Sequence, residues 1–166
     1  ICNWFHFSGI WIVMKYNFAK VTGLNTDIEA AQIIISEGSE NILLGILEIS
    51  CDDAFTRGKQ ILSDFIDSYN LEGESKSDGE KLKDSFTVTL KNLENVENFS
   101  AAIACLKGKV LYIIGKGCIN CSLKRFEKIS SLDSESGTLV SGFLQEGDRV
   151  FFATKNLTEF LGEDLK

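Results

Sequence analysis

The hydrophobic and polar positions of this chain predict strands first, then two long helices, then strands again. Short apolar or alternating runs indicate strands, and apolar residues that recur every three or four positions indicate helices. The expected elements, in chain order, are strands at 15–21, 30–35 and 42–49, a helix at 54–69, a loop at 70–80, a helix at 80–93, strands at 100–106, 110–114, 120–124, 126–129, 138–143 and 149–153, and a helix at 157–165. This order predicts a single α+β domain, with the two long helices packed on antiparallel sheet.

The run at 42–49 carries the strongest strand signal. It reads ILLGILEI and is almost continuously apolar, which is typical of a strand buried on both faces. Asp52 or Asp53 follows it and can cap the first long helix. The second long helix is expected in spite of its β-branched residues at 87–89.

Composition and charge narrow the class of protein. The chain has 166 residues, of which 44% are hydrophobic and 25% charged, as in an ordinary globular domain. Its net charge of −7 argues against a general nucleic-acid or anionic-membrane binder. The odd number of cysteines at irregular spacing disfavours a disulfide framework and favours a cytoplasmic location. The five are Cys2, Cys51, Cys105, Cys118 and Cys121.

The first 13 residues, ICNWFHFSGIWIV, are apolar and uncharged and precede the only methionine, Met14. The stretch is shorter than the roughly 20 residues that cross a bilayer, and it lacks the features of a signal peptide. We interpret residues 1–13 as an upstream extension or a disordered lead, and 14–166 as the domain. A strand with a few buried aromatic residues is the alternative. We therefore assign His6 no catalytic role.

Two short motifs are candidate sites. Cys118 and Cys121 form a C-x-x-C pair, but zinc needs two further ligands and a redox pair opens a helix. The pair lies between two expected strands, so we interpret both residues as members of a hairpin. The sequence Gly115–Lys116–Gly117 lacks the length and the following helix of a phosphate loop.

The segment 141–161 carries the most specific signal of the chain. It reads SGFLQEGDRVFFATKNLTEFL. A charged turn at 145–149 leads into an apolar strand, a polar break at 154–156 follows, and an amphipathic helix begins. This layout resembles the C-terminal motif of the PPM-type (metal-dependent, type 2C) protein serine/threonine phosphatases. In that family a Gly-Asp–Arg turn precedes a buried strand that ends in Ser-Asp-Gly, and the Asp holds a catalytic metal.

Weaker similarities continue along the chain from about Met14. Asn25–Thr26–Asp27 lies where the family has a turn ending Asn-Glu-Asp, and the strand at 42–49 lies where it has its first core strand. The hairpin around Lys107–Gly108–Lys109 also has a counterpart. The resemblance implies a four-layer αββα sandwich of antiparallel sheets with helices outside. The chain ends before the family's last strands, so it is either a shortened domain or one cut at its C-terminus.

The metal-binding positions depart from the family pattern. Lys155 replaces the metal-holding Asp and Asn156 the following Gly, while Lys116 stands where the family has the Asp of Gly-Asp-Ser. The Asp-Gly after the first core strand is also missing, and Glu48 or Ser50 occupies that region. A lysine about 4 Å from a cation repels it by about 4 kcal/mol at an effective dielectric of 20, and more strongly if the cation is divalent.

These departures predict a phosphatase-like domain without activity, expected to need no cofactor and to act as a binding or regulatory module in prokaryotic signalling. Its expected partner is a protein or phosphoprotein, with no nucleic acid and no membrane. The alternative is an active metal-dependent phosphatase that binds Mn²⁺ or Mg²⁺ through Asp27, Glu48 and Asp53. An unrelated α+β domain is the third hypothesis. On the first hypothesis Asp27 is a turn residue and Asp53 a helix cap.

Overall fold

The computed structural model describes residues 16–73, 75–132 and 136–161. The predicted leading segment 1–13 therefore lies outside the described residues. The elements are β1 (Glu29–Glu37), β2 (Asn41–Ser50), α1 (Ala54–Leu71), α2 (Asp78–Asn92), β3 (Asn98–Lys107), β4 (Val110–Lys116), β5 (Ile119–Arg125), β6 (Lys128–Ser131), β7 (Val140–Phe143), β8 (Arg149–Thr154) and α3 (Lys155–Leu161).

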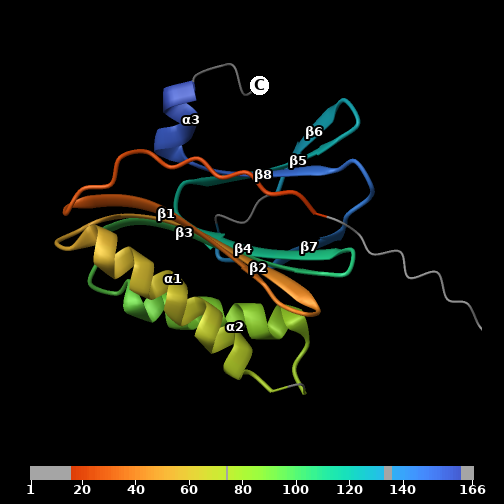
Figure 1. Cartoon of the computed structure of the whole chain (residues 1–166), viewed down its shortest axis with the longest axis horizontal. Helices are drawn as coiled ribbons and strands as arrows, with labels where there is room; N and C mark the ends of the chain where they lie inside the picture. The colour runs from red at the N-terminus through yellow and green to blue at the C-terminus, as the bar shows by residue number, and fades with distance from the viewer. Residues whose placement is uncertain (1–15, 74, 133–135, 162–166) are drawn as a thin grey trace, which may run out of the picture.

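The strands form two antiparallel sheets. One has the order β1-β2-β3-β4-β7 and the other β6-β5-β8. Helices α1 and α2 cover one face of the five-stranded sheet, and the three-stranded sheet lies against its other face (Figure 1). Among the described residues only the short α3 lies beyond the three-stranded sheet, so the predicted second outer layer is reduced to that helix.

Strand β2 contributes to both hydrophobic cores. Alternate residues of a strand face opposite sides. Leu43 and Leu47 are buried under the helices, where Phe65 of α1 is fully buried. Ile46 and Leu44 lie in the core between the sheets. By the same alternation Glu48 belongs to the side of β2 that faces the second sheet.

Helix α2 begins two residues earlier than the sequence predicts. Ser77 and Glu80 form a capping box: the Ser77 hydroxyl accepts from the Glu80 N–H, and the Glu80 carboxylate accepts from the Ser77 N–H. The S-x-x-E pattern was present in the sequence and marks this boundary. The β-branched residues did not break α2, because Thr89 is buried and its hydroxyl donates to the Ser85 carbonyl.

Two predicted strands were misplaced. The described residues 16–28 contain no strand, and their side chains at Val21 and Leu24 are exposed, so the expected strand at 15–21 lacks the ladder partner it needs. The expected strand at 126–129 is a turn followed by β6. Phe126 adopts a left-handed φ of 53° in that turn, and the paired residues are Arg125 and Lys128.

Candidate functional site

Four parts of the chain meet where β2 ends. Glu48 of β2 pairs with Ser100 at the start of β3. The Ser100 hydroxyl accepts a hydrogen bond from the Cys118 N–H at 3.0 Å, and the Cys118 carbonyl accepts from the Lys155 N–H at 3.1 Å. The β4–β5 turn and the β8–α3 junction are therefore fixed beside the end of β2.

Gly117 allows this close approach of the β4–β5 turn. Its φ is +88°, a left-handed value that favours glycine, and an added Cβ would lie 2.7 Å from the Phe99 carbonyl oxygen. The same Cβ would lie 2.9 Å from the Ser100 Cα. The sequence thus needs a glycine here to bring β3 against the turn.

The polar break at 154–156 is the start of α3, two residues earlier than predicted. Thr154 is buried, and its hydroxyl accepts from the Leu157 N–H at 3.4 Å in the position of a helix N-cap. The Thr158 hydroxyl donates to the Thr154 carbonyl at 3.0 Å. This cap places Asn156 in the first turn of α3, next to the end of β2.

The central contact of the site joins Asn156 and Glu48. The Asn156 amide donates a hydrogen bond of 2.5 Å to Oε1 of Glu48. The other carboxylate oxygen, Oε2, is buried and has no hydrogen-bond partner among the described residues. The site therefore presents one partly satisfied carboxylate in the space between the two sheets.

Neither Lys155 nor Lys116, which stand where the resembled family has Asp, contacts the Glu48 carboxylate. The Lys155 ammonium lies 3.6 Å from Glu159, one turn along α3. The Lys116 ammonium lies 5.9 Å from the centre of the Phe99 ring, a cation–π distance. Asn156, rather than Lys155, is the residue whose side chain reaches Glu48.

Asp27 and Asp53, the other two candidate ligands, lie near the same end of β2. The structure gives each of them a role through its backbone rather than its carboxylate. The Asp27 carbonyl accepts from the Ala54 N–H at 2.8 Å, in the bend before β1, as expected for a turn residue. Asp53 occupies the N-cap position of α1 with a left-handed φ of 54°, and its side chain makes no capping hydrogen bond. The prediction that Asp53 is a helix cap is thus confirmed in its position, at the start of α1.

A two-metal centre does not fit these residues. Within the described ranges no group of three or more His, Cys, Asp or Glu side chains could hold a metal ion. Mg²⁺ requires about six oxygen ligands in near-octahedral geometry. The Glu48 Oε2 atom offers a single ligand, and the neighbouring amide already occupies Oε1.

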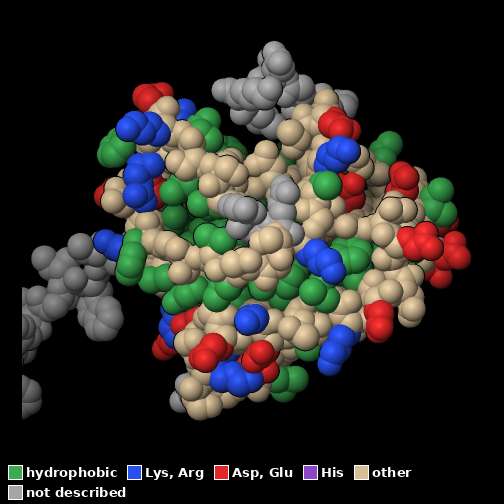
Figure 2. Space-filling view, turned by 180° about the vertical axis from the view of Figure 1, so that it is seen from behind, with side chains coloured by type: hydrophobic (Ala, Val, Ile, Leu, Met, Phe, Trp, Pro, Cys, Tyr) green, Lys and Arg blue, Asp and Glu red, His purple; other side chains and the backbone are tan. Residues whose placement is uncertain are grey.

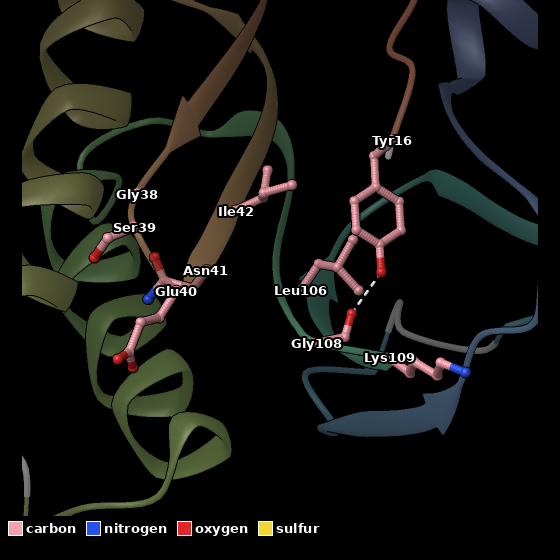
Figure 3. A pocket seen from close by; sticks show the side chains of 9 residues that line it. All are labelled: Tyr16, Gly38, Ser39, Glu40, Asn41, Ile42, Leu106, Gly108 and Lys109. Atoms are coloured by element: carbon pink, nitrogen blue, oxygen red, sulfur yellow. Dashed lines mark hydrogen bonds between the residues drawn. The ribbon is translucent and has the colours of Figure 1, made fainter. Parts of the chain in front are cut away.

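A cavity lies at the other end of β2. It has a volume of about 410 Å³ and is lined by Tyr16, the β1–β2 turn, Ile42, Leu106 and the β3–β4 turn. The Tyr16 hydroxyl donates to the Gly108 carbonyl across it, while Lys109 points away (Figure 3). Glu48 is six residues along β2 from Ile42, about 20 Å at ~3.3 Å per residue. The cavity is thus separate from the Glu48 site.

Neither Cys118 nor Cys121 forms a disulfide within the described residues. Cys118 is exposed in the turn before β5, and Cys121 is buried between the sheets. This agrees with the interpretation of the pair as hairpin residues.

Two solved structures share this arrangement of sheets. One is described as "The bacterial stressosome: a modular system that has been adapted to control secondary messenger signaling"; it has a TM-score of 0.58 and 14% identity over 75% of this chain and 68% of that one. The other is the catalytic domain of the serine threonine protein phosphatase PstP in complex with two manganese ions, with a TM-score of 0.56 and 11% identity over 87% and 78%. The chain has a PPM phosphatase-like fold.

At these identities the likeness establishes the PPM-like fold alone. No protein-family model and no curated protein matches the sequence. In the part of the chain that the structure describes, no helix is both long and apolar enough to span a membrane.

Proposed function

We propose that this chain is a PPM phosphatase-like domain that does not hydrolyse phosphoesters and acts as a binding or regulatory module for a protein partner, phosphoproteins included. The observation that carries the proposal is the hydrogen bond between Asn156 and Glu48. The Asn156 amide is hydrogen-bonded to the carboxylate at the end of the first core strand. In the resembled family this is the region that binds the metals.

The chemistry of the site supports this conclusion. Metal-dependent phosphoester hydrolysis needs a bound cation that activates water and neutralises the charge on phosphorus. A cation held by one carboxylate oxygen lacks the ligands for tight binding. The residues at the site instead fix α3 and the β4–β5 turn to the end of β2, which stabilises the scaffold.

A hydrolysis assay tests the proposal. The full 166-residue chain is incubated with p-nitrophenyl phosphate and with a phosphothreonine peptide at millimolar Mn²⁺, and compared with Glu48→Gln. We expect both proteins to give the rate of the protein-free control. Mn²⁺-dependent turnover that disappears in Glu48→Gln would overturn the proposal and favour the active phosphatase with a reduced metal set.

A further inference from the structure

Strand β1 forms a long open edge of the five-stranded sheet. It has nine residues and ends the strand order, with β2 as its ladder partner (Figure 1). Its pairing with β2 runs without interruption from Glu29 to Glu37, so no bulge twists the edge. The other strands that end a described sheet, β6, β7 and β8, have four, four and six residues. Strand β1 is therefore the longest edge of the described sheets, and an edge offers unpaired N–H and C=O groups to a further strand.

The hydrogen bonds around β1 define which residues point away from β2. The Cys51 N–H donates to the Ile28 carbonyl at 3.0 Å, which continues the ladder between β1 and β2. Because ladder bonds fall on alternate residues of an antiparallel strand, the even-numbered residues of β1 bond to β2 and the odd-numbered residues point away. The Ala31 N–H accordingly leaves the sheet and donates to the Asn25 side chain at 2.8 Å.

Ile33 and Ile35 are the next residues whose backbone groups point away from β2. Among the described residues, no hydrogen bond reaches either of them from outside the β1–β2 ladder. The usual protection of an edge is missing, because residues 30–36 carry no charge and the chain has no proline. A row of alternating donors and acceptors is satisfied by another extended backbone, whereas a helix has already bonded its own backbone groups internally. The chemistry of the edge thus indicates a strand as its occupant.

The segment before β1 does not fill this edge. It forms no strand in its described part, and Leu24 is 100% exposed. Its beginning is held elsewhere, because the Tyr16 hydroxyl donates to the Gly108 carbonyl and the Tyr16 ring packs against the core between the sheets. The hydrogen bonds that join this segment to β1 reach no further than Ala31. The remaining edge is open to a partner.

Both ends of the edge are acidic. Glu29 and Glu37 are exposed, and neither forms an ion pair with a described residue. They lie four residues to either side of Ile33, and this even separation puts all three side chains on the same side of the strand. In the view from behind, by contrast, Lys and Arg side chains lie among Asp and Glu over the helix layer (Figure 2). A strand with Lys or Arg opposite the two glutamates would form favourable cross-strand pairs, and the net charge of −7 also favours a basic partner.

We propose that the outer edge of β1 binds an extended segment of a partner protein as an additional antiparallel strand, with an apolar centre opposite Ile33 and a basic residue opposite each of Glu29 and Glu37. Antiparallel pairing continues the pattern of every described strand pair in this sheet. The inference is independent of the proposed function, because strand binding needs neither a metal nor a phosphoester.

A second copy of β1 is a poor occupant of the same edge. Antiparallel pairing of two copies about Ile33 would set Glu29 against Glu37 twice, and like charges directly opposite each other destabilise a sheet. Sedimentation of the full chain should therefore show a monomer. A dimer that is lost in Ile35→Pro would assign the edge to a second copy and overturn the proposal.

Two peptides of the same length as β1 test the strand and its charge. The first is Lys-Thr-Val-Thr-Val-Thr-Val-Thr-Lys, and the second has Glu in place of the two Lys. Each is titrated calorimetrically into the full chain at low salt. We expect the Lys-ended peptide to bind about tenfold more tightly, since two cross-strand pairs are attractive in one peptide and repulsive in the other, and added salt should narrow the difference. Equal binding of the two peptides, or binding of neither, would overturn the proposal.

Methylation of the peptide backbone tests the ladder itself. With the central Val opposite Ile33, the Val amides face β1 and the Thr amides face away from it. Methyl groups on the three Val nitrogens should abolish binding of the Lys-ended peptide, whereas methyl groups on the two central Thr nitrogens should leave most of it. Equal effects of the two modifications would show that the peptide does not pair with the edge.

Variants of the chain locate the binding site. Ile35→Pro removes an N–H that makes no ladder bond to β2, a position at which edge strands tolerate Pro, and it should lose the Lys-ended peptide. Glu29→Lys with Glu37→Lys should reverse the peptide preference. The control, Glu127→Lys with Glu146→Lys, changes the net charge equally at exposed positions outside β1 and should keep the preference. If Ile35→Pro fails to fold, the two charge variants still decide: an unchanged preference in the β1 variant, or a reversed one in the control, contradicts the proposal.

Discussion

The Asn156 amide and the Glu48 carboxylate are joined by a hydrogen bond of 2.5 Å across 108 positions of sequence. The contact links the first turn of α3 to the end of β2 and thereby ties one sheet of the sandwich to the other. It also places an uncharged donor on the only carboxylate that β2 contributes to this space. The structural role and the proposed loss of metal chemistry thus rest on the same pair.

Replacing Asn156 by Ala should destabilise the fold by about 1–2 kcal/mol, because the half-buried Glu48 carboxylate loses its donor. Urea unfolding followed by circular dichroism measures the change. Asn120→Ala, at an exposed position of β5, is the matched control and should change the free energy of unfolding by less than about 0.5 kcal/mol. Equal effects of the two substitutions would show that the contact adds nothing to stability.

Lys155→Asp should not create activity. The Lys155 ammonium lies by Glu159 rather than by Glu48, and a new carboxylate there still leaves the Asp-Gly after the first core strand missing. Hydrolysis of p-nitrophenyl phosphate at millimolar Mn²⁺ should stay at the level of the protein-free control. Substantial turnover in this single variant would mean that the rest of a metal site is already in place.

Gly117→Ala should destabilise the fold by more than about 2 kcal/mol, since the new Cβ meets backbone atoms of Phe99 and Ser100 in a left-handed conformation. Gly147 has nearly the same φ, +87°, and a Cβ added there would have no atom within 4 Å, so Gly147→Ala reports the cost of the backbone conformation alone. Thermal unfolding of both variants gives the difference. If Gly147→Ala is as damaging as Gly117→Ala, the close approach of β3 is not the cause.

The Arg125–Asp148 pair predicts a specific acid sensitivity. The Arg125 hydrogen bonds hold the pKa of Asp148 below its ordinary value. A lowered folded-state pKa stabilises the fold above the unfolded value, about 3.9, and this contribution is lost as pH falls through the folded-state pKa. Asp148→Asn should therefore be less stable than the wild type at pH 7, and the difference should shrink toward pH 3.

Urea unfolding at a series of pH values measures this dependence. Glu127→Gln is the control, because its carboxylate is 97% exposed and 3.9 Å from Lys124, where an ion pair contributes little. A stability difference between Asp148→Asn and the wild type that stays constant from pH 7 to pH 3 would contradict the assignment.

Local pattern was enough to predict the two long helices, the core strand β2 and the hairpin of β3 and β4, because their apolar spacing and turn residues are contiguous in sequence. The strand expected at 15–21 was wrong because pairing depends on a neighbour that the local sequence does not reveal. The Asn156–Glu48 contact could not be predicted either, since it depends on how two sheets meet. The sequence marks Asn156 as unusual, because it stands where the resembled family has a Gly. Only the fold shows that its partner is Glu48.

The exposed turn residue Phe126 gives a different lesson. Sequence pattern assigned it to a strand, because aromatic residues favour strands and a left-handed aromatic is rare in a turn. The mismatch between residue type and conformation is visible only in three dimensions. Such mismatches mark positions that are either strained or functional.

Calorimetric titration of Mn²⁺ into the full 166-residue chain tests the central claim most directly. With one partly occupied carboxylate at the site, we predict no binding at micromolar concentrations from a protein that is folded by circular dichroism. Binding of two ions at micromolar affinity, lost in Glu48→Gln, would contradict the account and show that the site assembles a working metal centre.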